Sequence, residues 1–269
     1  MKLRHAFALF VAALLVSGAV STNAEDVKPG AQAPQTFEKQ IPVKLEYLMY
    51  LPADYGKSPD KKWPLIFFLH GSGERGSDVQ KVAAHGPPLL LNPDKKPNKE
   101  FDPEKSKDGE AALRNFIVVS PQLPASESGW QTFSLNAMLD DILAKYHVDQ
   151  DRVYLTGLSM GGYGTWAWAS QNPRRFAAIA PMSGGGDPRR AARALKKMPI
   201  WNFHGEADTT VPIAESEKVV EAIQKGGNDE IKFTRYPGVG HNCWEIAYGN
   251  PELYSWFLSH TRQKPAGAK

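Results

Sequence analysis

The chain has 269 residues, 42% of them hydrophobic, which is enough for one sizeable core. A charged fraction of 23% and an aromatic fraction of 10% exclude an intrinsically disordered chain. The net charge of +3 and the single cysteine, Cys243, argue against a nucleic-acid partner and exclude an internal disulfide or a cysteine-based zinc site.

The first predicted element is a secretory signal peptide over residues 1–24. Basic Lys2 and Arg4 precede the apolar run 7–16, and small polar residues follow up to Ala24. The apolar run is shorter than the roughly 20 residues that a membrane-spanning helix needs, so a membrane anchor is the weaker interpretation. We therefore expect cleavage after Ala24 and a secreted or periplasmic protein with no membrane partner. Without Lys2 and Arg4 the rest of the chain is nearly neutral, which favours neutral substrates over polyanions.

Strands and helices are expected to alternate over residues 41–262. Residues 25–40 are rich in Pro, Gln and Ala and predict a flexible leader, and 263–269 predict a flexible tail. The predicted strands, most of them short apolar runs typical of parallel strands covered on both faces, are 43–51, 65–69, 116–120, 153–156, 177–182, 200–203 and 231–236. The predicted helices are 135–146, 160–171, 214–225 and 252–260.

This alternation predicts an α/β fold, with a mainly parallel central sheet, helices on both faces and a single domain over residues 41–262. One segment departs from the pattern. Residues 92–114 are rich in Lys, Asp, Glu and Pro and predict a charged insertion loop at the surface. A lid over a functional site is the alternative interpretation of this segment.

The strongest motif, Gly157-Leu158-Ser159-Met160-Gly161, lies between the predicted strand 153–156 and the predicted helix 160–171. A G-x-S-x-G sequence in this context is typical of a nucleophile elbow, a strained corner that lifts a serine hydroxyl out of the backbone. The N-terminus of the helix adds N–H groups where an oxyanion would form. We therefore predict that Ser159 is a nucleophile. A serine that merely caps the helix is the alternative.

A nucleophilic serine needs a base, and the base needs a carboxylate that orients it. Asp208 and His241 follow the elbow in that order, each just past a predicted strand, where open α/β sheets place their sites. We therefore predict Asp208 as the acid and His241 as the base, because the other histidines lack this order and placement. Glu206 is the rival acid, and Asp187 and Asp229 are less well placed.

The stabilising donors for an oxyanion are predicted from two loops. Met160 follows the nucleophile and offers its backbone N–H, and the Gly-rich loop 70–76 (HGSGERG) follows the strand 65–69. We predict the N–H of Ser72 as the second donor. Cys243 lies two residues after the predicted base and is expected to be a packing residue. The residues predicted to border the cleft and contact substrate, with ordinary packing as the alternative, are Trp130, Met182 and Trp244.

Together with His85-Gly86-Pro87-Pro88, His204-Gly205-x-x-Asp208 and Gly240-His241, these motifs resemble the exported esterases of the α/β-hydrolase superfamily. The nearest types are the phospholipase/carboxylesterase type and the polyhydroxybutyrate-depolymerase or feruloyl-esterase-like type, and the resemblance covers about residues 42–260. It implies the α/β-hydrolase fold, the triad Ser159, Asp208 and His241, and no metal or organic cofactor. The charged segment 92–114 departs from the compact family pattern.

The resemblance also implies a function. It implies hydrolysis of a small-molecule or polymer ester through an acyl-enzyme, with feruloyl, acetyl or polyester-type esters as the candidate substrates. The alternative enzyme class is a prolyl-oligopeptidase-like serine peptidase acting on small peptides, although the chain has no room for the propeller of those peptidases. A non-catalytic binding protein is the third hypothesis, and such proteins usually lack a triad member.

Overall fold

The computed structural model describes residues 42–92, 94 and 103–262, and those from Val43 onward form one compact unit. The predicted signal peptide (1–24), leader (25–40) and tail (263–269) lie outside the described residues. Within the described part of the chain, no helix is both long and apolar enough to span a membrane.

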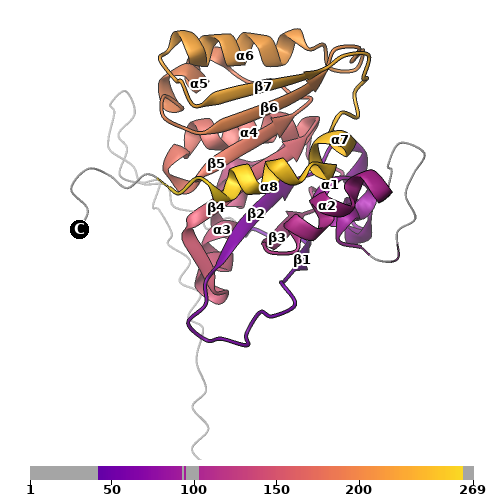
Figure 1. Cartoon of the computed structure of the whole chain (residues 1–269), viewed down its shortest axis with the longest axis vertical. Helices are drawn as coiled ribbons and strands as arrows, with labels where there is room; N and C mark the ends of the chain where they lie inside the picture. The colour runs from indigo at the N-terminus through magenta and orange to yellow at the C-terminus, as the bar shows by residue number, and fades with distance from the viewer. Residues whose placement is uncertain (1–41, 93, 95–102, 263–269) are drawn as a thin grey trace, which may run out of the picture. The chain divides into compact units, whose positions relative to one another are not determined.

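The centre of this unit is a sheet of seven strands among the described residues, in the order β1-β3-β2-β4-β5-β6-β7 (Figure 1). Only β1 runs antiparallel, at the edge beside β3, and the other neighbours are parallel. The strands are β1 Tyr47–Tyr50, β2 Trp63–Leu69, β3 Ile117–Pro121, β4 Val148–Leu158, β5 Ala178–Met182, β6 Ile200–Gly205 and β7 Ile231–Tyr236. All seven fall on predicted strands, so the predicted α/β fold with a mainly parallel sheet is confirmed.

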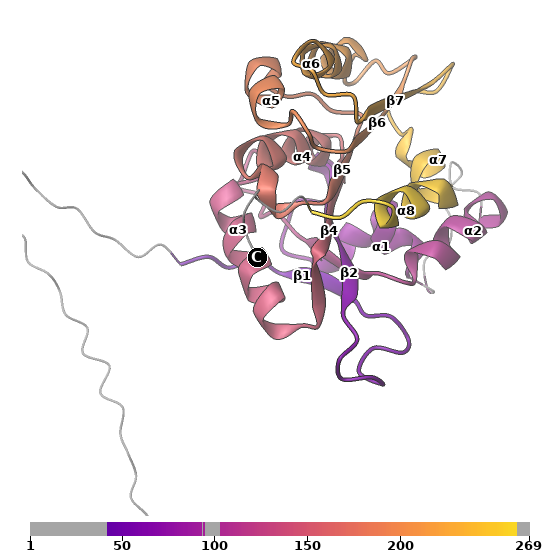
Figure 2. The ribbon, with the colours of Figure 1, turned by 60° about the vertical axis from the view of Figure 1, so that its left-hand side comes forward.

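Helices cover both faces of the sheet, as predicted. Figure 2, which views the sheet from its side, places α3, α4, α5 and α6 on one face and α1, α2, α7 and α8 on the other. The α-helices are α1 Gly86–Leu90, α2 Pro103–Leu113, α3 Thr132–Lys145, α4 Met160–Gln171, α5 Pro188–Ala194, α6 Ala214–Lys225, α7 Trp244–Gly249 and α8 Pro251–Leu258. Short 3₁₀ segments are η2 Ser72–Glu74, η3 Val79–Ala84 and η4 Pro173–Arg175.

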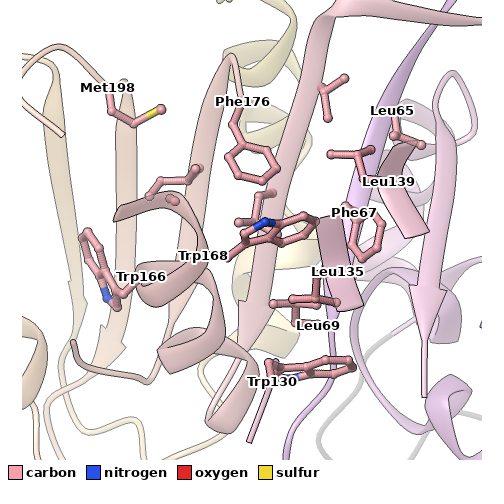
Figure 3. Packing of buried hydrophobic residues seen from close by; sticks show 14 of the residues in the cluster. Leu65, Phe67, Leu69, Trp130, Leu135, Leu139, Trp166, Trp168, Phe176 and Met198 are labelled. Carbon is pink, nitrogen blue, oxygen red and sulfur yellow. The ribbon is translucent and has the colours of Figure 1, made fainter. Parts of the chain in front are cut away.

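The face under α3 and α4 is filled by aromatic side chains. Trp168 of α4 packs edge-on against Phe67 of β2 and against Phe176, with ring centroids 5.0 and 4.8 Å apart (Figure 3). All three rings are buried. Burying one side chain of the size of Phe contributes on the order of 1.5–3 kcal/mol, so this cluster fixes α4, whose first residue follows Ser159.

The prediction of a surface loop at 92–114 is wrong for its second half, because residues 103–113 form the helix α2. The side chains of Ser106 and Leu113 are buried, and Gly109 packs so closely on α7 that an added Cβ would overlap the carbonyl of Gly249. The buried positions recur at helical spacing but hold only one large apolar residue, which is why the charged composition concealed the helix.

The parallel register brings the carboxyl ends of the strands to one edge of the sheet. Leu69 of β2 pairs with Gly157 of β4, and Leu158 pairs with Met182 of β5, which pairs in turn with Phe203 of β6. The residues that follow these positions therefore lie along the same edge, which is where open α/β sheets bind their ligands.

Candidate active site

Ser159 lies between β4 and α4 in a strained conformation. Its φ of 53° and ψ of −118° are unusual for a residue with a side chain, and such conformations cost on the order of 1–3 kcal/mol. The corner is possible because Gly161 has no Cβ, since one there would overlap the carbonyl of Leu69. The backbone N–H of Ser159 donates to the carbonyl of Met182, at 2.9 Å, which attaches the corner to β5. This geometry is that of a nucleophile elbow.

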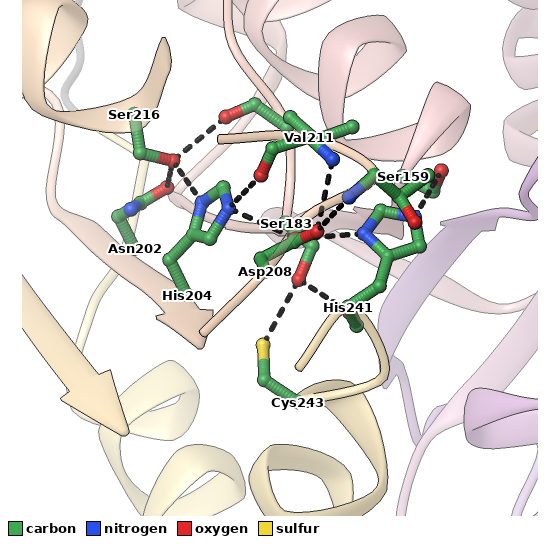
Figure 4. Close-up of polar contacts among 11 residues, drawn as sticks. Ser159, Ser183, Asn202, His204, Asp208, Val211, Ser216, His241 and Cys243 are labelled. Carbon is green, nitrogen blue, oxygen red and sulfur yellow. Dashed lines mark hydrogen bonds and ion pairs between the residues drawn. The ribbon is translucent and has the colours of Figure 1, made fainter. Parts of the chain in front are cut away.

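The structure brings together the three residues predicted as a triad (Figure 4). His241 Nε2 lies 2.9 Å from Ser159 Oγ, and His241 Nδ1 lies 2.7 Å from Asp208 Oδ2. Since the carboxylate can only accept, Nδ1 carries the hydrogen and Nε2 accepts from the serine hydroxyl. The side chain of His241 is about one fifth exposed (21%), whereas that of Asp208 is fully buried. The arrangement can remove a proton from Ser159 at a site open to solvent.

Asp208 is held by four donors. Its Oδ1 accepts from the backbone N–H groups of Thr210 and Val211, each at 2.9 Å. Its Oδ2 accepts from His241 and also from His204, whose Nε2 lies 3.1 Å away. Four hydrogen bonds stabilise the charged carboxylate at a buried position, where an unpaired charge would be strongly unfavourable.

Ser183 and Cys243 support the backbone at His241. Ser183 Oγ donates to the carbonyl of His241, at 2.8 Å, and lies 3.1 Å from Cys243 Sγ. Cys243 is fully buried, as predicted for a packing residue, and burial raises the pKa of its thiol to about 12. The ring of Trp244 meets that of His241 edge-on, with centroids 5.1 Å apart. The base therefore rests on a packed, neutral support.

The rival residues lie elsewhere. Glu206 is exposed, and Asp187 caps α5 by accepting from the backbone N–H groups of Arg189 and Arg190. Asp229 is exposed just before β7. None of these rivals has a hydrogen bond to His241 within the described residues, in contrast to Asp208.

Two backbone N–H groups are placed as the predicted oxyanion donors. Met160 is the first residue of α4, where N–H groups have no partner inside the helix. Ser72 is the first residue of η2, beside Gly71, at which an added Cβ would lie 3.6 Å from Ser159 Cβ. The Gly71 N–H is already used, since it donates to Glu74 Oε2 at 2.9 Å. The amide of Ser72, next along the loop, stays the predicted second donor.

The loop that carries Ser72 is braced by side chains. Arg75 donates from Nε to the carbonyl of Ser72, at 3.0 Å, and from Nη1 to that of Glu127, at 2.8 Å. Behind it, His70 is fully buried and its Nε2 accepts from the backbone N–H of Leu123, at 2.9 Å. Burial lowers the pKa of His70 to about 4. His70 is thus a neutral support for the loop and takes no part in proton transfer.

The predicted substrate contacts are mostly covered. Met182 has no exposed surface, so it reaches the site through its carbonyl and not through its side chain. Trp130 is 9% exposed, donates to the carbonyl of His70 at 3.3 Å and packs on its ring. Trp244 is 5% exposed. The contact of the two tryptophans with substrate stays a prediction.

Sequence reasoning missed the parts played by His204 and Ser183. His204 was not predicted to contact the acid, because residues four apart meet predictably only on a helix and His204 belongs to the strand β6. Ser183 carries no motif, and its φ of 46° cannot be inferred from its identity. Within the described residues no three His, Cys, Asp or Glu side chains group as a metal site would require.

Comparison with known proteins gives consistent matches. The family model described as "Putative esterase" matches residues 39–234. A solved structure of a thermostable esterase is 30% identical, with a TM-score of 0.64, over 81% of this chain and 60% of that one. A bifunctional acetylxylan esterase/xylanase of Neocallimastix patriciarum is 30% identical over 152 residues, or 54% of this chain. A probable feruloyl esterase C of Aspergillus terreus is 27% identical over 77% of this chain and 79% of its own length.

These matches differ in how much of each relative they cover. The chain spans 22% of the length of the acetylxylan esterase/xylanase. A feruloyl esterase module from Clostridium thermocellum has a TM-score of 0.60 but only 17% identity, so it supports the fold alone.

Proposed function

Because the chain belongs to the esterase family of α/β-hydrolases, we propose that it is a serine hydrolase that cleaves carboxylic esters through an acyl-enzyme. The observation that carries the proposal is the continuous hydrogen-bonded chain from Ser159 Oγ through His241 to Asp208, with separations of 2.9 and 2.7 Å. A strained nucleophile beside two backbone N–H groups is the arrangement that acyl transfer requires.

In the first half of the reaction, Ser159 Oγ attacks the ester carbonyl carbon as His241 Nε2 takes the hydroxyl proton. Asp208 stabilises the imidazolium that forms. The negative oxygen of the tetrahedral intermediate accepts from the N–H groups of Ser72 and Met160. The intermediate then collapses: the bond to the alcohol oxygen breaks, and His241 returns the proton to that oxygen. The acyl group stays on Ser159 as an ester.

In the second half, a water molecule takes the place of the alcohol. His241 removes a proton from the water as its oxygen attacks the acyl carbon, and the same two N–H groups hold the oxyanion. Collapse of this intermediate breaks the bond to Ser159 Oγ, which regains its proton from His241. The products are the carboxylic acid and the free enzyme.

The substrate class follows from charge and from the relatives. The chain is close to neutral once Lys2 and Arg4 are excluded, which favours neutral esters over polyanionic ones. Two relatives are named as acetylxylan and feruloyl esterases, and a third as a poly(3-hydroxyalkanoate) depolymerase of Paucimonas lemoignei. We propose acetyl, feruloyl or polyester-type esters, to be distinguished by kcat/KM on p-nitrophenyl acetate, butyrate and octanoate, methyl ferulate and a polyester.

Ser159→Ala tests the catalytic proposal. The variant is expected to lose ester turnover by about 10⁴-fold or more, because no other group supplies the nucleophile. Ser170→Ala, which truncates a buried serine on the same helix, is the matched control and should keep the activity of the parent. Folding is compared by circular dichroism and thermal unfolding. Retained turnover in a purified Ser159→Ala protein would contradict the proposal.

We also propose that the protein is exported, on the basis of the sequence of residues 1–24. Expression of the full chain followed by fractionation and N-terminal sequencing should find a product that begins at Glu25, outside the cytoplasm. A full-length product retained in the cytoplasm would contradict export without affecting the proposed chemistry.

A further inference from the structure

The proposed mechanism leaves one buried histidine beside the acid without a role. His204 belongs to β6 and its side chain has no exposed surface. Its Nε2 lies 3.1 Å from Asp208 Oδ2 and 2.9 Å from the carbonyl of Val211. Both of these atoms can only accept, so Nε2 carries a hydrogen and donates to them. His204 therefore holds Asp208 from the side opposite His241, as Figure 4 shows.

The other side of the ring is held as firmly. His204 Nδ1 lies 2.8 Å from Ser216 Oγ, and the same Oγ lies 2.7 Å from the carbonyl oxygen of Gly184, so one serine hydroxyl bridges the ring and that carbonyl. Ser216 belongs to α6, has no exposed surface, and Gly184 follows β5. A relay of hydrogen bonds thus connects a helix and a neighbouring strand, through the ring of His204, to one oxygen of Asp208.

That oxygen is the one on which the base depends. Asp208 Oδ2 accepts from His241 Nδ1 at 2.7 Å, while Oδ1 is held by two backbone N–H groups. Without the donor from His204, Oδ2 would accept from His241 alone, and His241 is on a partly exposed loop. An imidazole that can shift by a fraction of an ångström aligns less often with the serine hydroxyl.

We propose that His204 is a positioning residue, which fixes Asp208 Oδ2 where it binds His241 and so keeps His241 aimed at Ser159. The proposal rests on the proposed function. It differs from a simple packing role in a measurable way: a positioning residue acts on kcat through Asp208, whereas a packing residue acts on the folding of the whole unit.

The test compares two variants of His204 that fill a similar volume. His204→Leu removes the donor to Asp208, and His204→Gln supplies an amide N–H at about the reach of Nε2. We expect His204→Leu to lower kcat on p-nitrophenyl acetate by about 10- to 100-fold, with KM changed by less than about twofold. His204→Gln should recover at least about tenfold of a 100-fold loss. Equal losses in both variants would overturn the proposal.

A double-mutant cycle with Asp208→Asn separates positioning from packing. In the Asp208→Asn background, His204→Leu should lower kcat by less than about twofold, because the group through which it acts is gone. The same factor in both backgrounds would overturn the proposal. Asn228→Leu is the packing control: it removes a buried side chain that donates to the carbonyls of Leu195 and Met198, before β7. It should lower the Tm without lowering kcat of the folded enzyme.

If His204→Leu does not fold, Ser216→Ala carries the test, since it removes only the far link of the relay. It should lower kcat by about 2- to 10-fold in the parent and have no further effect in His204→Gln. An unchanged kcat in Ser216→Ala would then overturn the proposal. Ser159→Ala keeps the two proposals distinct, because turnover in that variant defeats the proposed function whatever His204 does.

Discussion

The dipeptide His-Gly occurs twice at the carboxyl edge of the sheet, as His70-Gly71 after β2 and as His204-Gly205 in β6. Both imidazoles are fully buried. The two hydrogen bonds of His70 go to backbone atoms, since it accepts from Leu123 N–H and lies against the carbonyl of Gly71, and the carboxylate of Glu74 is 3.9 Å from Nδ1. His204 bonds to a carboxylate and a hydroxyl as well as to backbone. The same residues at equivalent places in the fold therefore support different halves of the site.

The comparison shows that the structural role of a buried histidine depends on its hydrogen-bond partners and not on its burial. His70 supports the loop that carries Ser72, the proposed oxyanion donor, and His204 supports Asp208, the proposed acid. In the proposed mechanism, one support serves the charge that develops on the substrate and the other the charge that develops on His241.

The largest expected effect on kcat comes from replacing Asp208, the carboxylate to which His204 donates. Asp208→Asn should lower kcat by about 10⁴-fold, because an amide N–H would face the two imidazole N–H groups that now donate to the carboxylate. The measurement is kcat and KM on p-nitrophenyl acetate, with thermal unfolding as the check on folding. A loss smaller than about tenfold would show that His241 does not depend on this acid.

The next largest effect on kcat is expected in the loop that His70 supports, at the backbone N–H of Ser72. Ser72→Pro deletes the backbone N–H of residue 72, and proline suits the first position of a helical turn. It should lower kcat by about 10²- to 10³-fold with little change in KM, as expected for a donor used only in the transition state. Ser72→Ala retains the amide and should lose less than about tenfold. If both variants lose activity equally, the hydroxyl matters and the N–H does not.

A smaller effect concerns stability and pH. The pKa of His70 is lowered to about 4 in the folded protein, against 6.5 for an unperturbed histidine. Between these two pKa values the unfolded chain binds more protons than the folded one. The contribution of His70 to the stability of the fold is therefore complete above pH 6.5 and is lost as the pH falls toward 4. Between pH 7 and pH 4.5, the free energy of unfolding of the parent should fall by about 2–3 kcal/mol more than that of His70→Gln.

Denaturant unfolding at the two pH values measures this difference. His147→Gln is the control, because His147 is exposed and its replacement should leave the pH dependence of the parent in place. Identical pH dependence in the parent and in His70→Gln would mean that His70 is not held neutral by burial.

Much of the fold and of the site could be predicted because the signals were local. The bounds of α4, α6 and β7 match their predicted ranges, since α6 and β7 have the periodicity of their own elements and α4 begins directly after the motif at Ser159. The proximity of Ser159, Asp208 and His241 could be predicted because each follows a strand, and parallel strands bring their carboxyl ends together. The order of these residues along the chain was then enough to predict that the three meet at one place.

The rest depended on contacts that the sequence does not state. The helix α2 was missed because its buried face holds Ser106 and Gly109, which carry no apolar signal. The role of His204 depends on Val211 and Ser216, which only the turn after β6 brings to its ring. The side chain of Met182 was expected at the cleft but is fully buried in a hydrophobic core cluster.

The most direct test of the proposed mechanism is to trap the nucleophile. The purified parent is treated with a fluorophosphonate ester, which phosphonylates an activated serine, and the modified peptide is sequenced by mass spectrometry. We expect one adduct, on Ser159, formed at least about 10³-fold more slowly in His241→Gln, because the base no longer removes the hydroxyl proton. An adduct on another residue, or an equal rate in His241→Gln, would contradict the account.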